Sequence, residues 1–490
     1  MRHRLGWLLR LAGSGCWSTA VVAGLLRVSI AVAADAQRPN ILLCIADDWS
    51  WPHAGVYGDQ VVKTPTFDRL AREGALFTHA FCATPSCTPS RAAILTGQYP
   101  HRLEQGANLW GFLPNKFAVY PDLLERAGYV VGLRGKGWGP GSVPAGGWKR
   151  NPAGPSFKSI EDFLKAVPEG RPFCFWYGST DPHRPYDKGT GADSGMKPEA
   201  VVVPPCFPNS LEVRNDILDY YFEVQRFDRD VGAIVRALEA AGLLDKTLLV
   251  VTSDNGMPFP RCKTNLHDSG TRMPLVIRWP GRATVGRVLD DLVHLSDLAP
   301  TFLEAAGLKP LPEMTGQSLV PLLEGKTQAG RGQVFLERER HANVRQGDLG
   351  YPVRAIRTRE FLYARNLLPD RWPAGDPQMW KAVGDFGDCD GSPTKELILA
   401  HRQDAGMARA FELGFAKRPA EELYNLAQDP HQTNNLASLP QYAEARQRLR
   451  ARLGRWMEDS HDPRAEGGGD EFDGYPYFGE VRRPQTNRER

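Results

Sequence analysis

Cysteine is scarce in this chain of 490 residues, and its eight cysteines follow no repeated spacing. That distribution excludes a disulfide framework and a zinc knuckle. A surplus of one charge is also missing, because 60 Lys and Arg face 57 Asp and Glu and the basic residues do not run together. Nucleic-acid binding and a polybasic membrane contact are therefore not predicted, and an anionic substrate must be recognised locally.

Long hydrophobic runs are missing too, apart from one near the start of the chain. Residues 1–33 combine early arginines, an apolar stretch and the small-residue ending Ala31-Val32-Ala33. This pattern predicts a cleaved secretory signal. A permanent membrane anchor is the alternative, but Arg27 interrupts the run, which is short for a bilayer span. We therefore expect a periplasmic or secreted protein with no membrane span after cleavage.

Four apolar, β-branched runs that end abruptly in polar residues indicate buried parallel strands. The runs are Asn40 to Asp48, Tyr129 to Lys136, Pro172 to His183 and Thr247 to Gly256. Helical patterns lie between and after them, at Thr66 to Glu73, Pro121 to Ala127, Asn215 to Ala241 and Leu295 to Ala306. Strands that alternate with helices predict an α/β sandwich with a large, mostly parallel sheet.

The sequence pattern changes after about residue 330, where the strand-like runs become shorter and a stretch rich in Gly and Asp spans Gly384 to Gly391. We predict a catalytic domain at 38–330 and a smaller C-terminal α+β domain at 331–465. An amphipathic pattern predicts a helix from Tyr442 to Met457 near the end of the second domain. Residues 466–490 are predicted to form a loosely ordered tail.

Two pairs of oxygen-bearing side chains follow predicted strands. Asp47 and Asp48 end the first run, and Asp254 and Asn255 end a later one. Ligands collect at the carboxyl ends of strands in such sheets, so we expect the two pairs to meet. Three carboxylates and one amide oxygen favour Ca²⁺ or Mg²⁺ over zinc. An Asp-Asp pair alone would indicate a turn or a helix cap, and the matching second pair favours the metal.

The stretch Cys87 to Arg91, CTPSR, places a cysteine at the start of a predicted helix. Pro89 suits the first turn of a helix, so Cys87 is expected just before it, where the helix dipole favours an anion and Arg91 faces the same point. A thiolate would be stabilised there. A cysteine nucleophile also needs a base, and no His with an Asn or Asp partner identifies one. A cysteine protease or phosphatase is therefore disfavoured.

CTPSRAAILTG matches the pattern C-x-P-x-R, and the chain resembles the type I sulfatases from RPNILLCIADD to ELYNLAQDPHQTNNLA. The resemblance implies an alkaline-phosphatase-like sandwich. It also implies that a formylglycine-generating enzyme oxidises Cys87 to formylglycine, which is hydrated to a geminal diol. The modified residue then serves as the nucleophile that removes sulfate from its carrier.

The same resemblance assigns roles to the residues at the strand ends. Ca²⁺ is the implied cofactor. The implied ligands are Asp47, Asp48, Asp254, Asn255 and the oxygen of modified Cys87. Arg91 and Lys136 are implied to steady the diol, while His183 and Lys263 contact the sulfate group.

One position departs from the family pattern. The family usually shows GK-x-H, but GKGWGPG places Trp138 where the histidine would stand. That histidine is usually assigned to orienting or deprotonating the diol, so another base must replace it if the chain is active. His101, His267 and His341 are the candidates, although a lone histidine is more often a packing or surface residue.

The segment DNGMPFPRCKTNLHDSGTRMPL resembles that of the heparan N-sulfatases more than that of the arylsulfatases. A sulfated saccharide is therefore the expected partner, with the N-sulfated glucosamine of heparin or heparan as substrate. His341 and Arg354 are predicted to line the rim of the sugar pocket, the alternative being that they are surface charges. An exo-acting O-sulfatase on another polysaccharide and an inactive, carbohydrate-binding relative remain open. A two-zinc phosphatase is disfavoured, because the eleven histidines lack the required spacing.

Overall fold

The computed structural model describes residues 38–326, 331–381 and 383–480, which belong to one compact unit. The predicted signal at 1–33 lies outside the described residues. A large sheet forms the centre of this unit, with strand order β3-β4-β1-β5-β6-β2-β7 and with β8 paired to β2. Its strands are β1 (Asn40–Ala46), β2 (Ala75–Phe81), β3 (Val130–Gly135), β4 (Phe173–Gly178), β5 (Thr247–Ser253), β6 (Arg272–Arg278), β7 (Arg287–Leu289) and β8 (Val293–His294).

The four predicted apolar runs are the four adjacent parallel strands β3, β4, β1 and β5. Strand β6 runs antiparallel to both of its neighbours, β5 and β2. The prediction of a large, mostly parallel sheet is therefore confirmed, with β6 as its antiparallel member. Because β6 returns at the edge where β5 ends, the connection between them stays at the carboxyl edge of the parallel strands.

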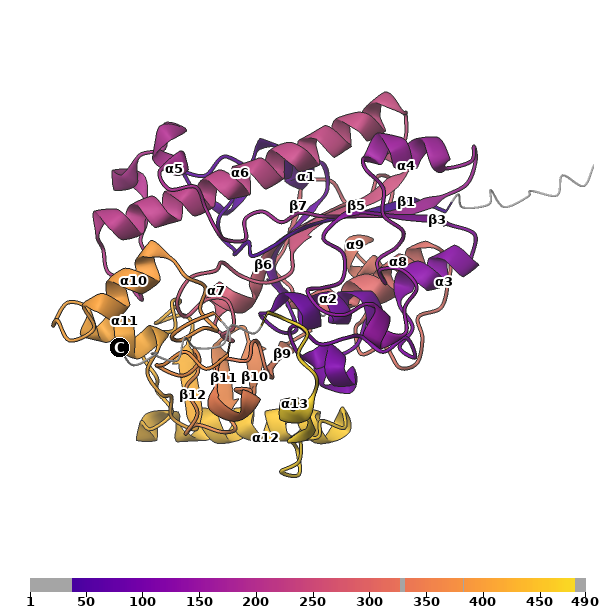
Figure 1. The fold of residues 1–490 in the computed structure, drawn as a ribbon. Coiled ribbons are helices and arrows are strands. Elements are labelled where there is room, and N and C mark those ends of the chain that lie inside the picture. Colours follow the sequence, from indigo (N-terminus) through magenta and orange to yellow (C-terminus); the bar gives the residue numbers. More distant parts are fainter. Residues whose placement is uncertain (1–37, 327–330, 382, 481–490) are drawn as a thin grey trace, which may run out of the picture. The chain divides into compact units, whose positions relative to one another are not determined.

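Both faces of the sheet are covered by helices, as the continuous apolar strands require. Ile41, Leu43 and Ile45 of β1 pack into one hydrophobic cluster, and the intervening Leu42 and Cys44 pack into the other. Figure 1 shows the long α6 crossing one side of the sheet. The helices on that face are α1 (Pro65–Glu73), α4 (Ile160–Ala166) and α6 (Leu211–Ala240), and on the opposite face α2 (Cys87–Thr96), α3 (Tyr120–Arg126) and α8 (Leu298–Ala305).

A second sheet of four antiparallel strands follows, in the order β12-β11-β10-β9. One face of this second sheet packs against Phe81 of β2 and against Leu266. Helix α12 covers the other face and buries Leu449 and Leu453 against it (Figure 1). The elements are β9 (Gln333–Arg338), β10 (Val353–Thr358), β11 (Phe361–Asn366), β12 (Glu421–Asn425) and α12 (Ala443–Asp459). The shorter helices of the chain are α5 (Thr190–Asp193), α7 (Asp268–Thr271), α9 (Val320–Leu323), α10 (Pro393–Ala400), α11 (Ala408–Gly414) and α13 (Glu471–Gly474).

The prediction of a loosely ordered tail is wrong for residues 466–480. Phe472 of α13 is buried, and its carbonyl accepts a hydrogen bond of 2.7 Å from Asn108 Nδ2. The guanidinium of Arg340 donates to the carbonyls of Asp473 and Tyr475. Polar composition concealed these contacts, because hydrogen bonds to backbone carbonyls hold this segment together with a few buried aromatic side chains such as Phe472. Residues 481–490 lie outside the described residues.

Within the described part of the chain, no helix combines the length and apolarity needed to cross a bilayer.

Candidate active site

The two predicted oxygen-bearing pairs meet at the carboxyl edge of the sheet. Strands β1 and β5 pair in parallel with Ala46 opposite Ser253, so the residues that follow them emerge side by side. The backbone N–H of Asp48 donates to Asp254 Oδ1 at 3.2 Å, and Asn255 Nδ2 donates to Asp48 Oδ1 at 2.6 Å. Asp48 has a φ of 80°, a conformation that an L-residue adopts rarely and that is found at functional sites.

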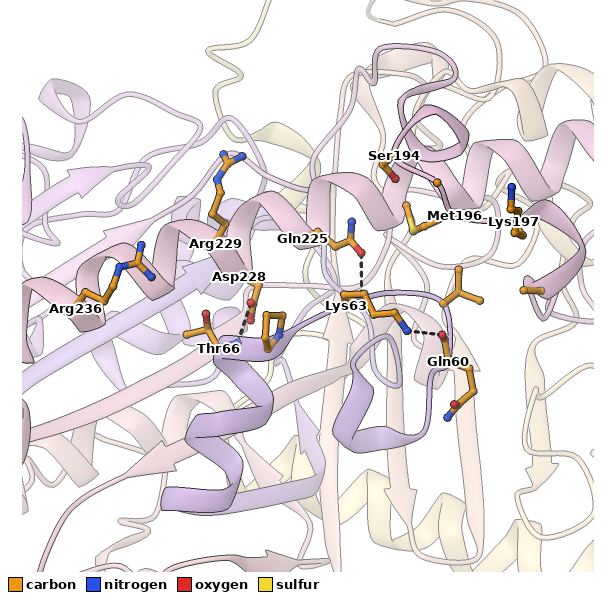
Figure 2. A pocket seen from close by; sticks show the side chains of 14 residues that line it. Gln60, Lys63, Thr66, Ser194, Met196, Lys197, Gln225, Asp228, Arg229 and Arg236 are labelled. Atoms are coloured by element: carbon orange, nitrogen blue, oxygen red, sulfur yellow. Dashed lines mark hydrogen bonds between the residues drawn. The ribbon is translucent and has the colours of Figure 1, made fainter.

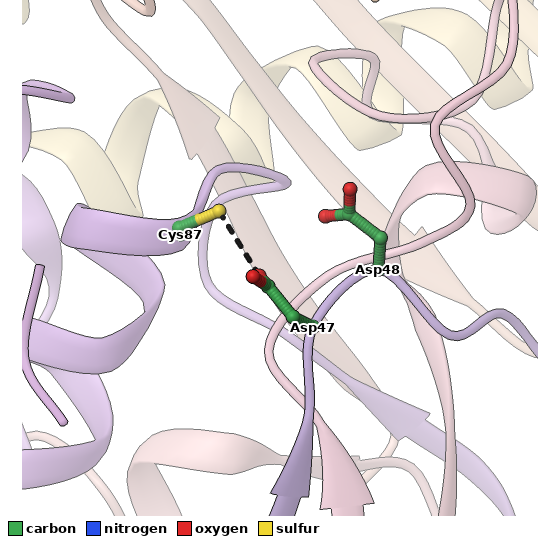
Figure 3. Close-up of side chains that lie close together, drawn as sticks. All are labelled: Asp47, Asp48 and Cys87. Atoms are coloured by element: carbon green, nitrogen blue, oxygen red, sulfur yellow. Dashed lines mark hydrogen bonds between the residues drawn. The ribbon is translucent and has the colours of Figure 1, made fainter. Parts of the chain in front are cut away.

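Cys87 faces this edge from the first residue of α2. Figure 3 shows its side chain pointing at Asp47, with Sγ donating to Asp47 Oδ1 at 3.4 Å. The sequence placed Cys87 just before the helix, whereas Ser86 is the N-cap and Cys87 is the first helical residue. Every residue of α2 is buried. The helix is thus a fixed support that aims Cys87 at the carboxylates.

Two cations tie α2 and the end of β3 to the carboxylates. Arg91 Nε donates to Asp254 Oδ2 at 2.7 Å, and another guanidinium nitrogen donates to the carbonyls of Lys136 and Gly137 at 2.8 and 3.0 Å. Lys136 Nζ lies 2.6 Å from Asp47 Oδ2. Arg91 is fully buried, so its charge is compensated within the site rather than by water.

Lys263 and His183 approach from the other side, around Asp48. Lys263 Nζ lies 2.8 Å from Asp48 Oδ2 and 3.2 Å from Asp390 Oδ2. Burial alone would lower the pKa of Lys263, but Asp390 and Asp48 raise it well above its ordinary value. Lys263 therefore keeps its proton. His183 Nε2 lies 3.9 Å from Asp48 Oδ2, and its side chain is 34% exposed, so it stands at the open side of the site.

The sequence reasoning missed Asp390. Its carboxylate, the carboxylate of Asp48 and the imidazole of His183 form a group whose ligand atoms are all within 4.8 Å of one another. Its only signal was the Gly- and Asp-rich stretch from Gly384 to Gly391, in which it lies. Nothing in that composition distinguishes a site residue from a turn residue.

The carboxylates and the thiol differ in proton affinity. Burial alone would raise the pKa of Asp47, but the surrounding cations, Lys136 foremost, hold it below its ordinary range. Burial raises the pKa of Asp254 to about 6 despite its contact with Arg91. Burial and the charge of Asp47 raise the pKa of the Cys87 thiol well above its ordinary value. The prediction of a stabilised thiolate is therefore wrong, because burial, followed by the charge of Asp47, favours the neutral thiol.

The donor set fits a hard divalent cation. Asn255 Oδ1 is buried and accepts no hydrogen bond within the described part of the chain, which is costly unless a cation meets it. The nitrogen-bearing end of this amide donates to Asp48 Oδ1, and ligand atoms of Asp47, Asp48 and Cys87 all lie within 4.8 Å of one another. Oxygen donors of this kind select Ca²⁺ or Mg²⁺.

Trp138 occupies the position at which a histidine was expected. Its side chain is buried, its indole N–H finds no acceptor among the described residues, and its backbone N–H donates to Asn151 Oδ1. Among the three candidate replacements, His341 lies beside the nucleophile position, because its Nδ1 is 2.8 Å from the hydroxyl of Ser86. Burial lowers the pKa of His341 to about 3, so the ring is neutral.

The other two candidate histidines have partners elsewhere. His101 Nδ1 is 2.9 Å from Glu337 Oε2, and His267 Nε2 is 3.6 Å from Glu422 Oε2. Arg354, predicted at the pocket rim, has no exposed surface and is enclosed in ion pairs with Glu339 and Asp462. The rim prediction is therefore wrong for Arg354. The guanidinium of Arg354 on β10 stays buried because α12 and the residues that follow it cover the face of the second sheet from which Arg354 projects.

These observations define a hydrolase with an alkaline-phosphatase-like architecture and an acidic, cation-lined site at the strand ends. The family model "Sulfatase" matches residues 39–140 and 154–308, and the model "N-sulphoglucosamine sulphohydrolase, C-terminal" matches residues 262–367. The chain therefore belongs to the sulfatase family, whose members hydrolyse sulfuric esters or sulfamates. The predicted family, enzyme class and fold are thereby confirmed.

Several relatives share most of their length with this chain. The human N-sulphoglucosamine sulphohydrolase is 32% identical over 500 residues, which cover 91% of this chain and 94% of that protein. An ulvan-active sulfatase of Formosa agariphila is 29% identical, with coverage of 88% and 82%. A solved structure in complex with its substrate D-glucosamine-2-N,6-O-disulfate is 19% identical, with a TM-score of 0.62 and coverage of 88% and 99%. The phosphonate monoester hydrolase of Agrobacterium radiobacter has a TM-score of 0.60 at 19% identity, over 86% of this chain and 96% of that one, which extends the shared fold beyond sulfatases.

Proposed function

We propose that the protein removes sulfate from a sulfated sugar, with the N-sulfated glucosamine of heparin or heparan fragments as its substrate. The observation that carries this proposal is the convergence of Cys87, three carboxylates and the cations Arg91, Lys136 and Lys263 at one strand edge. The human relative named for N-sulphoglucosamine supports the choice of sugar. The ulvan-active relative favours a second candidate, an O-sulfatase acting on another polysaccharide.

Cys87 is proposed to be oxidised to formylglycine by a formylglycine-generating enzyme, which supplies the site with a hydrated aldehyde as nucleophile. The residues around Cys87 support this proposal. Arg91 and Lys136 bring positive charge to the start of α2, and Asp47 contacts the Cys87 side chain directly. A buried, high-pKa thiol cannot itself act as a ready nucleophile. This fits a role for Cys87 as precursor.

Ca²⁺ is proposed to bind Asp47, Asp48, Asp254, Asn255 and the modified Cys87, where it would offset negative charge on the sulfate oxygens. Lys136 and Lys263 contact these carboxylates and are positioned to bind the sulfate as well. Lys263 stays protonated in its acidic surroundings and so binds the anion as a cation. His183, whose side chain is more exposed than that of Lys263, is the group best placed to donate a proton to the departing sugar amine or hydroxyl.

His341 is proposed to fix the start of α2 through Ser86 and to line the saccharide side of the site. Its ring is buried next to Ser86, and its pKa of about 3 leaves it neutral. A neutral ring can orient the modified residue through Ser86, which is the role left vacant at Trp138. We further propose export to the periplasm or beyond the cell, on the basis of the signal pattern in residues 1–33.

The experiment that tests this function has two parts. Mass spectrometry of the Cys87 peptide from the native host should show the aldehyde and its hydrate. A panel of N-sulfated glucosamine, O-sulfated glucosamine, sulfated galactose and an aryl sulfate should then give its highest kcat/KM with the first. Cys87→Ala should abolish sulfate release with an unchanged circular dichroism spectrum. An unmodified thiol together with inactivity on every sulfate would instead indicate a carbohydrate-binding protein.

A further inference from the structure

A cavity in the described part of the chain lies apart from the strand-edge site. It has a volume of about 690 Å³ and runs between α6, the start of α1 and the segment 194–200. Figure 2 shows the side chains that line it. The catalytic residues come from the ends of β1, β3, β4 and β5 and from α2, and none of them lines this cavity. We call it the basic groove.

Four cationic side chains line the basic groove, namely Lys63, Lys197, Arg229 and Arg236. Arg229 and Arg236 are seven residues apart on one face of α6, and the helical rise of about 1.5 Å per residue separates them by about 10 Å. Lys63 and Lys197 extend the row beyond the helix (Figure 2). The positive charges therefore form a line rather than a point, which suits an extended anion better than a small one.

Little negative charge opposes this row. Asp228 is the one acidic residue in the lining, and its carboxylate is buried and accepts hydrogen bonds from the backbone N–H groups of Thr66 and Phe67 at 3.0 and 2.8 Å. Arg229 has a single weak ion pair, 3.4 Å from Asp230. Lys197 and Arg236 make no ion pair with any residue that the structure describes. The groove thus presents uncompensated cations to solvent.

The neutral part of the lining has the chemistry of a saccharide site. Gln60, Gln225 and Thr66 offer amide and hydroxyl groups that can bond sugar hydroxyls, and Val61 and Met196 offer apolar surface to ring faces. No aromatic side chain lines the groove, so it has no platform for a nucleobase. Cations in a row, interspersed with amides and apolar patches, match a sulfated chain.

We propose that the basic groove is a second binding site that holds a segment of a sulfated saccharide chain away from the catalytic centre. This inference rests on the proposed function for the nature of the chain. The groove raises the affinity of the enzyme for long sulfated substrates by adding contacts that a monosaccharide cannot make.

The test compares two sets of four charge removals on the full chain. The groove variant carries Lys63→Gln, Lys197→Gln, Arg229→Gln and Arg236→Gln. The matched control carries Arg448→Gln, Arg450→Gln, Arg452→Gln and Arg455→Gln on α12. It removes the same number of positive charges from a different surface. Both sets are placed on Cys87→Ala, so that a fluorescent heparin oligosaccharide binds without turnover. Binding is measured by fluorescence anisotropy at several salt concentrations.

We expect the groove variant to bind the oligosaccharide about tenfold more weakly, because each exposed contact contributes little and four act together. The control should stay within about twofold of the parent, and a desulfated oligosaccharide should not bind. With Cys87 intact, the ratio of kcat/KM for the oligosaccharide to kcat/KM for N-sulfated glucosamine should fall about tenfold in the groove variant.

Two results would overturn the proposal. An equal loss of oligosaccharide affinity in the groove variant and in the α12 control would show that the oligosaccharide is attracted to positive charge anywhere on the surface. Inorganic sulfate that competes as tightly as the oligosaccharide would assign the groove to a small anion. Turnover of N-sulfated glucosamine by the unaltered enzyme tests the proposed function separately, so failure of that assay leaves the binding comparison interpretable.

Discussion

Replacing the buried Arg354 should damage stability and leave substrate affinity intact. Its Nε donates to Asp462 Oδ2 at 2.6 Å, and another of its guanidinium nitrogens donates to Asp462 Oδ1 at 3.0 Å and to Glu339 Oε1 at 2.8 Å. The third nitrogen donates to the carbonyls of Arg338 and Val353. Arg354→Met keeps much of the side-chain volume and removes all five hydrogen bonds at once.

The size of the effect follows from the burial of the partners. Asp462 and Glu339 are nearly inaccessible to solvent, so their carboxylates would lose a cation that water cannot replace. Breaking a buried pair in this way costs about 3–5 kcal/mol. Arg464 also contacts Glu339, at 2.8 Å, and still compensates part of its charge in the variant. We therefore expect a loss of unfolding free energy at the lower end of that range.

Urea unfolding followed by tryptophan fluorescence measures this loss, with the exposed Arg448→Met as the control for removing an arginine. Steady-state kinetics on the folded variant should give a KM within about twofold of the parent. A KM raised more than tenfold, with an unchanged unfolding midpoint, would show that Arg354 contacts the substrate and would refute the account of the second sheet given above.

Three further outcomes are expected. Dialysis against a chelator should lower the sulfatase activity, and Ca²⁺ should restore it where Zn²⁺ does not; activity that never responds to prolonged chelation would count against a metal at the Asp-rich site. Asp390→Asn should reduce kcat/KM by about tenfold to hundredfold, because it removes a charged partner of Lys263 at a cost of about 1.5–3 kcal/mol; a change below twofold would show that Asp390 is dispensable. Burial and then the charge of Asp181 raise the pKa of Glu223 to about 7 from an ordinary 4.5, so the folded state holds the extra proton between these values and loses stability as the pH rises through them. Glu223→Gln should therefore be more stable than the parent at about pH 8 and equal to it below about pH 4.5 in urea titrations; a constant difference at every pH would contradict this reasoning.

The strands that build the site were predictable because they are buried on both faces. Such strands show continuous apolar runs, and each polar pair that ends a run marks the carboxyl edge. The positions of Asp47, Asp48, Asp254 and Asn255 followed from that rule alone. The place of Cys87 needed the family pattern, since composition gives no reason to prefer it to the other buried cysteines.

Residues that come from the later part of the chain, after the first sheet, were less predictable. Asp390 lies within a Gly- and Asp-rich stretch, and only the tertiary fold carries it to Lys263. The prediction that Arg354 lines the pocket was wrong because a strand in a short antiparallel sheet is expected to leave one face in water. Here α12 and the segment that contains Asp462 cover that face, and no local pattern in β10 shows it.

The contact between Lys263 and Asp390 ties a late part of the chain to its early part. At ribosomal rates of about 5–20 residues per second, the roughly 300 residues between Cys87 and Asp390 take on the order of tens of seconds to appear. In the finished protein only 2% of Cys87 is exposed to solvent. Any enzyme that must reach this thiol therefore has to act before the chain has folded around it.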